Sequence, residues 1–179
     1  RRRAGRSLPP LRLDRSRFRA SRPGPTTTAG AGMRHKKRRI IPCISGMPLA
    51  YHHHMGTVIE TEEDTVRLLE NTDDSVKLTL DTGHMLFAQG DSLKILNDFS
   101  ERLIHMHCKD IRKSVLEKSL KEDLSFRGAF LEGAFTVPGD GCIDYKPLFD
   151  VLKEKNYSGW LVEEAEQDPA KANPLEYAK

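Results

Sequence analysis

The sequence predicts a parallel α/β protein whose strands end in side chains of the metal-ligand and acid-base types. From residue 48 onward, apolar runs of strand length alternate with helical patterns, an order typical of β/α units in a parallel sheet. Four of these runs finish in histidine, aspartate, lysine or glutamate. Because parallel strands bring their carboxyl ends to one edge of a sheet, we expect these side chains to form a single site there.

A basic segment, residues 1–45, precedes this pattern and is expected to be disordered. Residues 1–39 hold 14 of the 29 basic residues and one of the 26 acidic residues, so their net charge is +13 and that of residues 40–179 is −10. The segment is rich in Arg, Pro, Ser and Gly and has no apolar periodicity. Three origins stay open: a nucleic-acid-binding arm, a transit peptide, or non-native sequence read out of frame.

The composition of residues 40–179 argues against several classes of protein. Its acidic balance gives no general attraction for nucleic acid, and no apolar run is long enough to span a bilayer. The cysteines, Cys43, Cys108 and Cys142, form neither a disulfide framework nor a metal-binding CxxC pair, which favours a reducing cytoplasm. The chain starts at Arg1 and stops at Lys179 without a capping feature, so we expect both ends to be cut.

The first strand is predicted at Pro48–Tyr51, and it runs into three consecutive histidines. His52 and His54 share one face by the period of two, and His53 lies on the other. A tag remnant or a solvated cluster is the alternative, but histidines inside an apolar strand are atypical of a tag. We therefore expect a metal or substrate role for His52 or His54.

A helix over Thr61–Glu70 is predicted next, because Thr61 and Asp64 have the spacing of a capping box. The central strand then ends at Asp81, with His84 three residues further on. This order places a carboxylate and an imidazole where the chain leaves the core.

A second helix is predicted at Ser92–Phe99, followed by a strand at Leu103–Cys108 that ends in Lys109-Asp110. Within that strand His105 and His107 share a face. Residues 112–135 have leucines at helical spacing and then three phenylalanines, which indicates a helix and an irregular, lid-like loop.

The last unit contains a tight turn at Val137–Gly141, an amphipathic helix at Tyr145–Lys155 and a strand at Trp160–Val162. That strand ends in Glu163-Glu164. It completes the alternation of strand and helix on which the predicted fold class depends.

The predicted ligands form a nitrogen and oxygen set without thiolate: Asp81, His107, Glu164 and a residue from the His52 strand. Such a set suits a divalent Mn, Co, Mg or Zn with open positions for substrate. A metal of this kind polarises a carbonyl, so that a nearby base can remove the α-proton. The candidates for that base are His54, His84 and Lys109.

Five segments, among them LDTGHM, HMHCKD and GWLVEEAEQDPAKANPLEYAK, occur in an order that resembles the C-terminal half of the inosose dehydratase family. These enzymes belong to the xylose-isomerase-like sugar isomerase and epimerase barrels. The resemblance implies that residues 46–179 form part of a (β/α)8 TIM barrel, its C-terminal half. It also implies a cytoplasmic hydro-lyase of inositol catabolism that dehydrates 2-keto-myo-inositol (scyllo-inosose) to a trihydroxycyclohexane-dione with Mn²⁺ or Co²⁺.

The same resemblance implies that Asp81, His107 and Glu164 are metal ligands, and leaves His52 or Glu60 as the fourth. Glu163 departs from the apolar residue usual at its position, and we expect it to cost stability on the helix-facing side of the strand unless it is paired.

A full barrel needs about 250 residues, so the 179-residue chain is expected to be a truncated or frame-disrupted product. Alternatives are another metal-dependent sugar isomerase or epimerase, a nucleic-acid repair protein, and an inactive remnant. The expected partner is a small polyol ketone, without nucleic acid or membrane for the domain, and the resemblance leaves room for a homo-oligomer.

Overall fold

The computed structural model of the protein describes residues 48–177. The segment 1–45 that the sequence predicts to be disordered lies outside the described residues, as does its boundary with the folded part. Both stay predictions.

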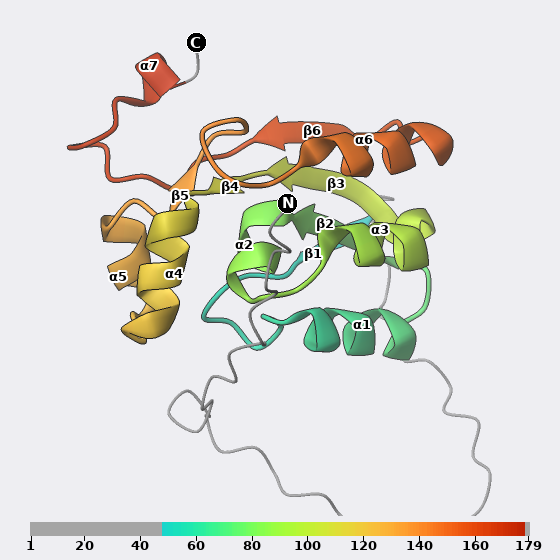
Figure 1. Ribbon diagram of the computed structural model, residues 1–179. Coiled ribbons are helices and arrows are strands. Elements are labelled where there is room, and N and C mark those ends of the chain that lie inside the picture. The colour runs from blue at the N-terminus through green and yellow to red at the C-terminus, as the bar shows by residue number, and fades with distance from the viewer. Residues whose placement is uncertain (1–47, 178–179) are drawn as a thin grey trace, which may run out of the picture. The chain divides into compact units, whose positions relative to one another are not determined.

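The centre of the described part is a parallel sheet of four strands in the order β1-β2-β3-β6. The arrowheads of β3 and β6 point the same way in Figure 1, toward the side on which α4 and α5 lie. The parallel α/β class expected from the sequence is therefore confirmed. The strands are β1 Leu49–His52, β2 Val76–Asp81, β3 Leu103–Cys108 and β6 Trp160–Glu163.

Helices connect these strands and cover one face of the sheet. None of those within residues 48–177 has the length and apolar character needed to cross a bilayer. The α-helices are α1 Glu62–Asn71, α2 Thr82–Phe87, α3 Ser92–Phe99, α4 Lys113–Lys121, α5 Phe126–Leu131, α6 Tyr145–Glu154 and α7 Pro174–Tyr177; a 3-10 turn, η2, spans Ser100–Arg102.

The main core lies between this face of the sheet and helices α1, α3 and α6. Strands β2 and β3 contribute alternate apolar side chains such as Leu78, Leu80 and Met106, each no more than 1% exposed. Because the other alternate positions of the same strands point to the opposite face, the core fixes which side chains are left for the site.

Local sequence signals explain the helix boundaries. The hydroxyl of Thr61 accepts from the backbone N–H of Asp64, whose carboxylate in turn accepts from the N–H of Thr61, so the predicted capping box is confirmed. The α3 and α6 predictions are confirmed to within one residue. The helix α2, which was not predicted, begins directly after β2 because Asp81 caps it through the N–H of His84.

The lid-like loop predicted within residues 112–135 is wrong. The helix α5 forms there because Ser125 caps it through the N–H of Gly128. The chain then enters β5 Phe135–Thr136, which pairs antiparallel with β4 Asp110–Ile111. A small separate core packs beneath this segment and holds α4 and α5 in place.

The expected cost of burying Glu163 is also wrong, because its side chain is exposed. The residue lies on β6, which is an edge strand of the described sheet. A carboxylate at such an edge stays hydrated.

Candidate metal and active site

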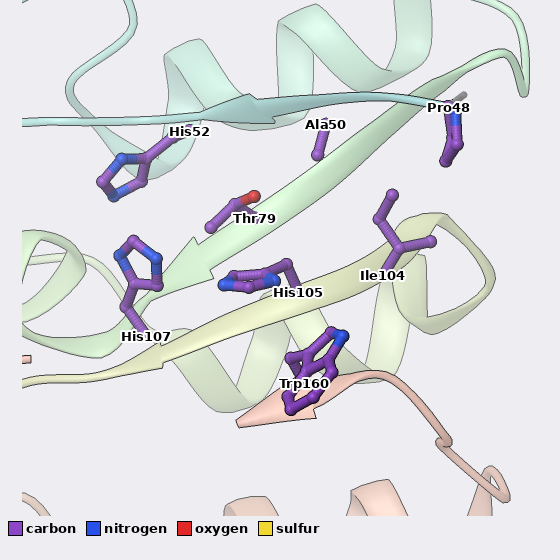
Figure 2. Close-up of a pocket in the computed structure, with 8 residues that line it drawn as sticks. All are labelled: Pro48, Ala50, His52, Thr79, Ile104, His105, His107 and Trp160. Carbon is purple, nitrogen blue, oxygen red and sulfur yellow. The ribbon is translucent and has the colours of Figure 1, made fainter. Parts of the chain in front are cut away.

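Neighbouring strands bring the predicted metal ligands to one edge of the sheet. His52 ends β1, Asp81 ends β2, His107 lies next to the end of β3, and Glu164 follows β6 directly. The register pairs Asp81 with His107, so their side chains lie on the same face. His52 and His107 point toward one another from β1 and β3 across that face in Figure 2.

The distances among these side chains are those of a compact cluster. Oδ2 of Asp81 lies 3.4 Å from Nε2 of His52 and 3.5 Å from Nδ1 of His107. The same Nδ1 lies 2.7 Å from Oε2 of Glu164. Three of these side chains could bind one metal ion together, because one ligand atom of each lies within 4.8 Å of the other two. The three residues are His52, Asp81 and His107.

The ligand atoms of all four side chains are buried and lack a hydrogen bond among the described residues: His52 Nε2, Asp81 Oδ2, His107 Nδ1 and Glu164 Oε2. Buried polar atoms without hydrogen bonds are rare and require an explanation. Two carboxylate oxygens and two imidazole nitrogens that face one another fit a divalent cation of borderline hardness. The residues present therefore fit the metal that the sequence predicts.

The two oxygens of Asp81 have different surroundings. Oδ1 accepts from the backbone N–H of His84 at 2.9 Å and so starts α2, whereas Oδ2 faces His52 and His107. The side chain of His53, which points to the other side of β1, accepts the backbone N–H of Asp81 at Nε2, 3.2 Å away. These contacts fix the carboxylate before any ligand arrives.

The alternative fourth ligand, Glu60, lies elsewhere in its local loop. Its carboxylate accepts from the backbone N–H of Gly56 at 3.3 Å, and it belongs to neither ligand group found among the described residues. The geometry favours His52 for that position.

A second group, His54, His84 and Glu166, lies beside the first. Glu166 contacts His54 Nε2 at 3.5 Å and His84 Nε2 at 3.4 Å through its two oxygens. Sequence reasoning missed Glu166. Its signal is its spacing, because a residue two positions after Glu164 can return to the same side of the chain.

Lys109 joins the two groups. Its ammonium lies 2.9 Å from Glu166, 3.2 Å from Glu164 and 3.3 Å from Asp81, and 3.0 Å from Nε2 of His84. The side chain is fully buried, so these contacts take the place of water. The three residues predicted as bases, His54, His84 and Lys109, are thus all within this cluster, and their roles stay predictions.

Burial and charge set the protonation of the group. Burial lowers the pKa of Lys109, but Asp81 and Glu166 outweigh it, so the net pKa is raised and Lys109 is an ammonium. Burial lowers the pKa of His84 to about 3, so this imidazole is neutral near pH 7. Burial raises the pKa of Glu166, but His54 and Lys109 bring it down to about 2.

The metal-type cluster is electrostatically coupled in the same way. The pKa of His107 is raised to about 9 by its contacts with Asp81 and Glu164. Burial of Asp81 acts to raise its pKa, yet His107 and His52 hold it well below the usual range. The pKa of Glu164 is also lowered, chiefly by its contact with His107, so both carboxylates are ionised near neutral pH. A divalent cation bound by this cluster would displace the proton from His107.

Four parallel strands connected by helices, with such a site at their carboxyl ends, are the arrangement found in part of a sugar-isomerase-type barrel. Residues 42–179 match the protein family described as the xylose isomerase-like TIM barrel, and the chain belongs to that family. The fold class expected from the resemblance is confirmed.

Particular relatives are inosose dehydratases. The enzyme of Clostridium beijerinckii is 53% identical over 134 residues, which cover 74% of this chain and 45% of that enzyme. The enzyme of Lactiplantibacillus plantarum is 53% identical over 135 residues, 75% of this chain and 45% of its own length. The predicted resemblance is confirmed, and the chain spans about 45% of the length of these relatives.

Solved structures share the fold at low identity. The crystal structure of the IOLI protein with a bound zinc atom is 21% identical, with a TM-score of 0.51 over 74% of this chain and 43% of that chain. A xylose isomerase domain protein from Planctomyces limnophilus is 17% identical, with a TM-score of 0.53 over 74% and 42%. At these identities the likeness concerns the fold alone.

Proposed function

We propose that this chain carries the metal-binding part of an inosose dehydratase, a hydro-lyase that converts 2-keto-myo-inositol (scyllo-inosose) to a trihydroxycyclohexane-dione. The observation that carries the proposal is the convergence of four buried ligand atoms without hydrogen bonds in a segment 53% identical to inosose dehydratases. The proposal keeps residues 46–179 as the barrel part and the cytoplasm as the location. The free thiols of Cys108 and Cys142 support the latter.

The proposed metal is Mn²⁺ or Co²⁺, held by His52, Asp81, His107 and Glu164. Nitrogen and oxygen donors without thiolate support this assignment. When bound, such an ion polarises the substrate carbonyl and so acidifies the neighbouring C–H. The protein's part is to hold the donors at the ends of four adjacent strands.

Two proton transfers remain for the protein side chains. The α-proton must leave carbon, and the β-hydroxyl must leave with a proton as water. We assign these steps to the cluster of His54, His84 and Lys109, in which His84 is neutral and Lys109 holds a proton. Glu166 orients this cluster, because it contacts all three.

A matched pair of neighbouring carboxylates tests the proposal. Glu164→Gln removes a proposed ligand, whereas Glu163→Gln changes an exposed residue one position earlier. The chain and both variants are titrated with Mn²⁺ and Co²⁺ by calorimetry and assayed for dione formation from scyllo-inosose. We expect stoichiometric binding that Glu164→Gln weakens at least about 100-fold and Glu163→Gln leaves unchanged.

The outcomes separate the parts of the proposal. Equal metal binding in both variants would overturn the ligand assignment. Conversion of keto-hexoses without any dione from scyllo-inosose would replace dehydration by isomerisation or epimerisation on the same fold. Metal binding without either reaction would restrict this chain to the binding part and withdraw the activity from it.

A further inference from the structure

The second group of ligand-type side chains, His54, His84 and Glu166, is as compact as the proposed metal site. Its three ligand atoms all lie within 4.8 Å of one another. The ring centroids of the two histidines are 3.6 Å apart, and each oxygen of Glu166 reaches one of the rings. Two imidazoles and a carboxylate form a donor set that divalent ions such as Co²⁺ and Zn²⁺ bind.

A cationic side chain already lies at this group. The ammonium nitrogen of Lys109 is 2.9 Å from Oε2 of Glu166 and 3.0 Å from Nε2 of His84. These two atoms face each other at 3.4 Å, so a metal ion at this group would bind both of them. The lysine side chain is fully buried, and its charge is therefore screened little by water.

A metal ion and this ammonium cannot occupy the group together. Metal bonds to imidazole nitrogen and carboxylate oxygen are about 2.0–2.2 Å long, so an ion bound to both atoms would lie within about 4 Å of the ammonium. Two like charges at that separation repel strongly in a buried site. The lysine has no room to move toward α2, because its side-chain carbons would lie 2.7–2.9 Å from a Cβ atom on Gly83.

Aromatic rings border the group and offer no ligand in place of a cation. The ring of Phe126 lies 5.2 Å from that of His54, and the ring of Phe135 lies 5.3 Å from that of His84. Phe135 also lies 5.4 Å from the ammonium of Lys109. Beside such a wall a carboxylate needs a positive partner, so removal of the lysine leaves Glu166 with a strong preference for another cation.

We propose that Lys109 takes the place of a second divalent ion, and that His54, His84 and Glu166 bind such an ion when the lysine is removed. In the parent chain the lysine thus keeps both histidines free of metal and available for proton transfer. The binding of a second ion rests on the geometry of the group alone, whereas the benefit for proton transfer rests on the proposed function.

The number of bound Co²⁺ ions tests the inference. Chains loaded with excess Co²⁺ are gel-filtered and analysed for cobalt. We expect Lys109→Ala to bind one ion more per chain than the parent, and Lys109→Ala/His54→Ala to lose that extra ion. Lys113→Ala, which removes an exposed lysine, should match the parent. An unchanged count in Lys109→Ala, or an extra ion that persists without His54, overturns the proposal.

A second pair of variants decides the question if Lys109→Ala does not fold without metal. Glu164→Gln removes one of the carboxylates that the lysine balances, and it also weakens the first metal site. Compared with Glu164→Gln alone, Lys109→Ala/Glu164→Gln should gain one tightly bound Co²⁺, and a further His54→Ala should remove it. Equal counts in two variants that are both folded by circular dichroism overturn the proposal.

Failure of the proposed function gives a different result. A parent chain that binds no Co²⁺ overturns the first metal site, whereas an extra ion in Lys109→Ala still supports this inference. A parent chain that binds two ions, one of which is lost in His54→Ala, overturns this inference and leaves the first site in place.

Discussion

At the residue scale, the site depends on side chains with two separate contacts. Asp81 caps α2 with one oxygen and faces His52 and His107 with the other. His53 contacts the backbone of Asp81 from the opposite side of β1. The three consecutive histidines therefore make three different contacts. His52 faces the proposed metal, His53 accepts a hydrogen bond from the backbone of β2 at Asp81, and His54 contacts Glu166.

The buried His53 makes stability depend on pH. Burial lowers its pKa from 6.5 to about 4, so between these values the unfolded chain binds a proton that the folded chain does not. The metal-free protein should lose stability as pH falls from 6.5 to 4, by about 3 kcal/mol from this residue. Urea unfolding over that range should show a shallower pH dependence for His53→Gln; an identical slope in both proteins would contradict the prediction.

Lys109 supplies the positive charge that the carboxylates need when no metal is bound. Its ammonium lies within 3.3 Å of Asp81, Glu164 and Glu166, so Lys109→Met should destabilise the metal-free chain by about 3–5 kcal/mol. Metal binding should restore part of this loss. The rise in Tm on adding Co²⁺ should therefore be larger in Lys109→Met than in the parent.

The control for this experiment is Lys113→Met, an exposed lysine at the start of α4. Its Tm should change by little, because exposed charges contribute about 0–1 kcal/mol. Equal Co²⁺-induced shifts in the parent and in Lys109→Met would show that the lysine does not balance the ligand charges.

At the element scale, the close packing of α2 against β3 positions the cluster. A methyl group on Gly83, in the first turn of α2, would meet side-chain carbons of Lys109 at 2.7–2.9 Å. Lys109 is fully buried and held by several contacts, so it has little room to move. The absence of a side chain at Gly83 therefore allows the lysine to reach the carboxylates.

Gly83→Ala should destabilise the protein by about 1–3 kcal/mol through overpacking. Gly128→Ala is the matched control, because its nearest atoms lie at 3.4–4.0 Å and it lies within α5. Alanine in a helix is favoured over glycine by about 0.5–1 kcal/mol, so this control should be neutral or stabilising. Urea midpoints measure both, and equal changes at the two positions would contradict the packing argument.

At the scale of the whole molecule, the proposed metal links all four strands of the sheet. A ligand that binds only the folded state stabilises it by about 2.7 kcal/mol at 100 times its Kd. Co²⁺ should therefore raise the Tm of the parent chain, and a chelator should reverse the rise. Asp81→Ala should abolish the shift, because the buried Oδ2 is lost. A parent chain whose Tm does not respond to metal would contradict a site assembled from these strands alone.

The sequence by itself determined the order of the four strands of the sheet and most of the candidate residues. Strand ends at Asp81 and Cys108 and the capping box at Thr61 could be predicted because hydrophobic periodicity and capping are local properties. The family resemblance likewise depended on contiguous segments. The predicted residues lie at one edge of the sheet because parallel strands all bring their carboxyl ends to the same edge.

The tertiary structure decided what depends on distant partners. Glu166 joins the cluster because the chain after β6 returns to Lys109 and His54; its spacing from Glu164 is compatible with this contact but does not specify it. The fourth ligand could not be chosen from spacing, whereas the structure places His52, and not Glu60, beside Asp81. The lid-like loop was wrong because α5 has a local cap at Ser125 and is also held by packing against a separate small core, which no local pattern reveals.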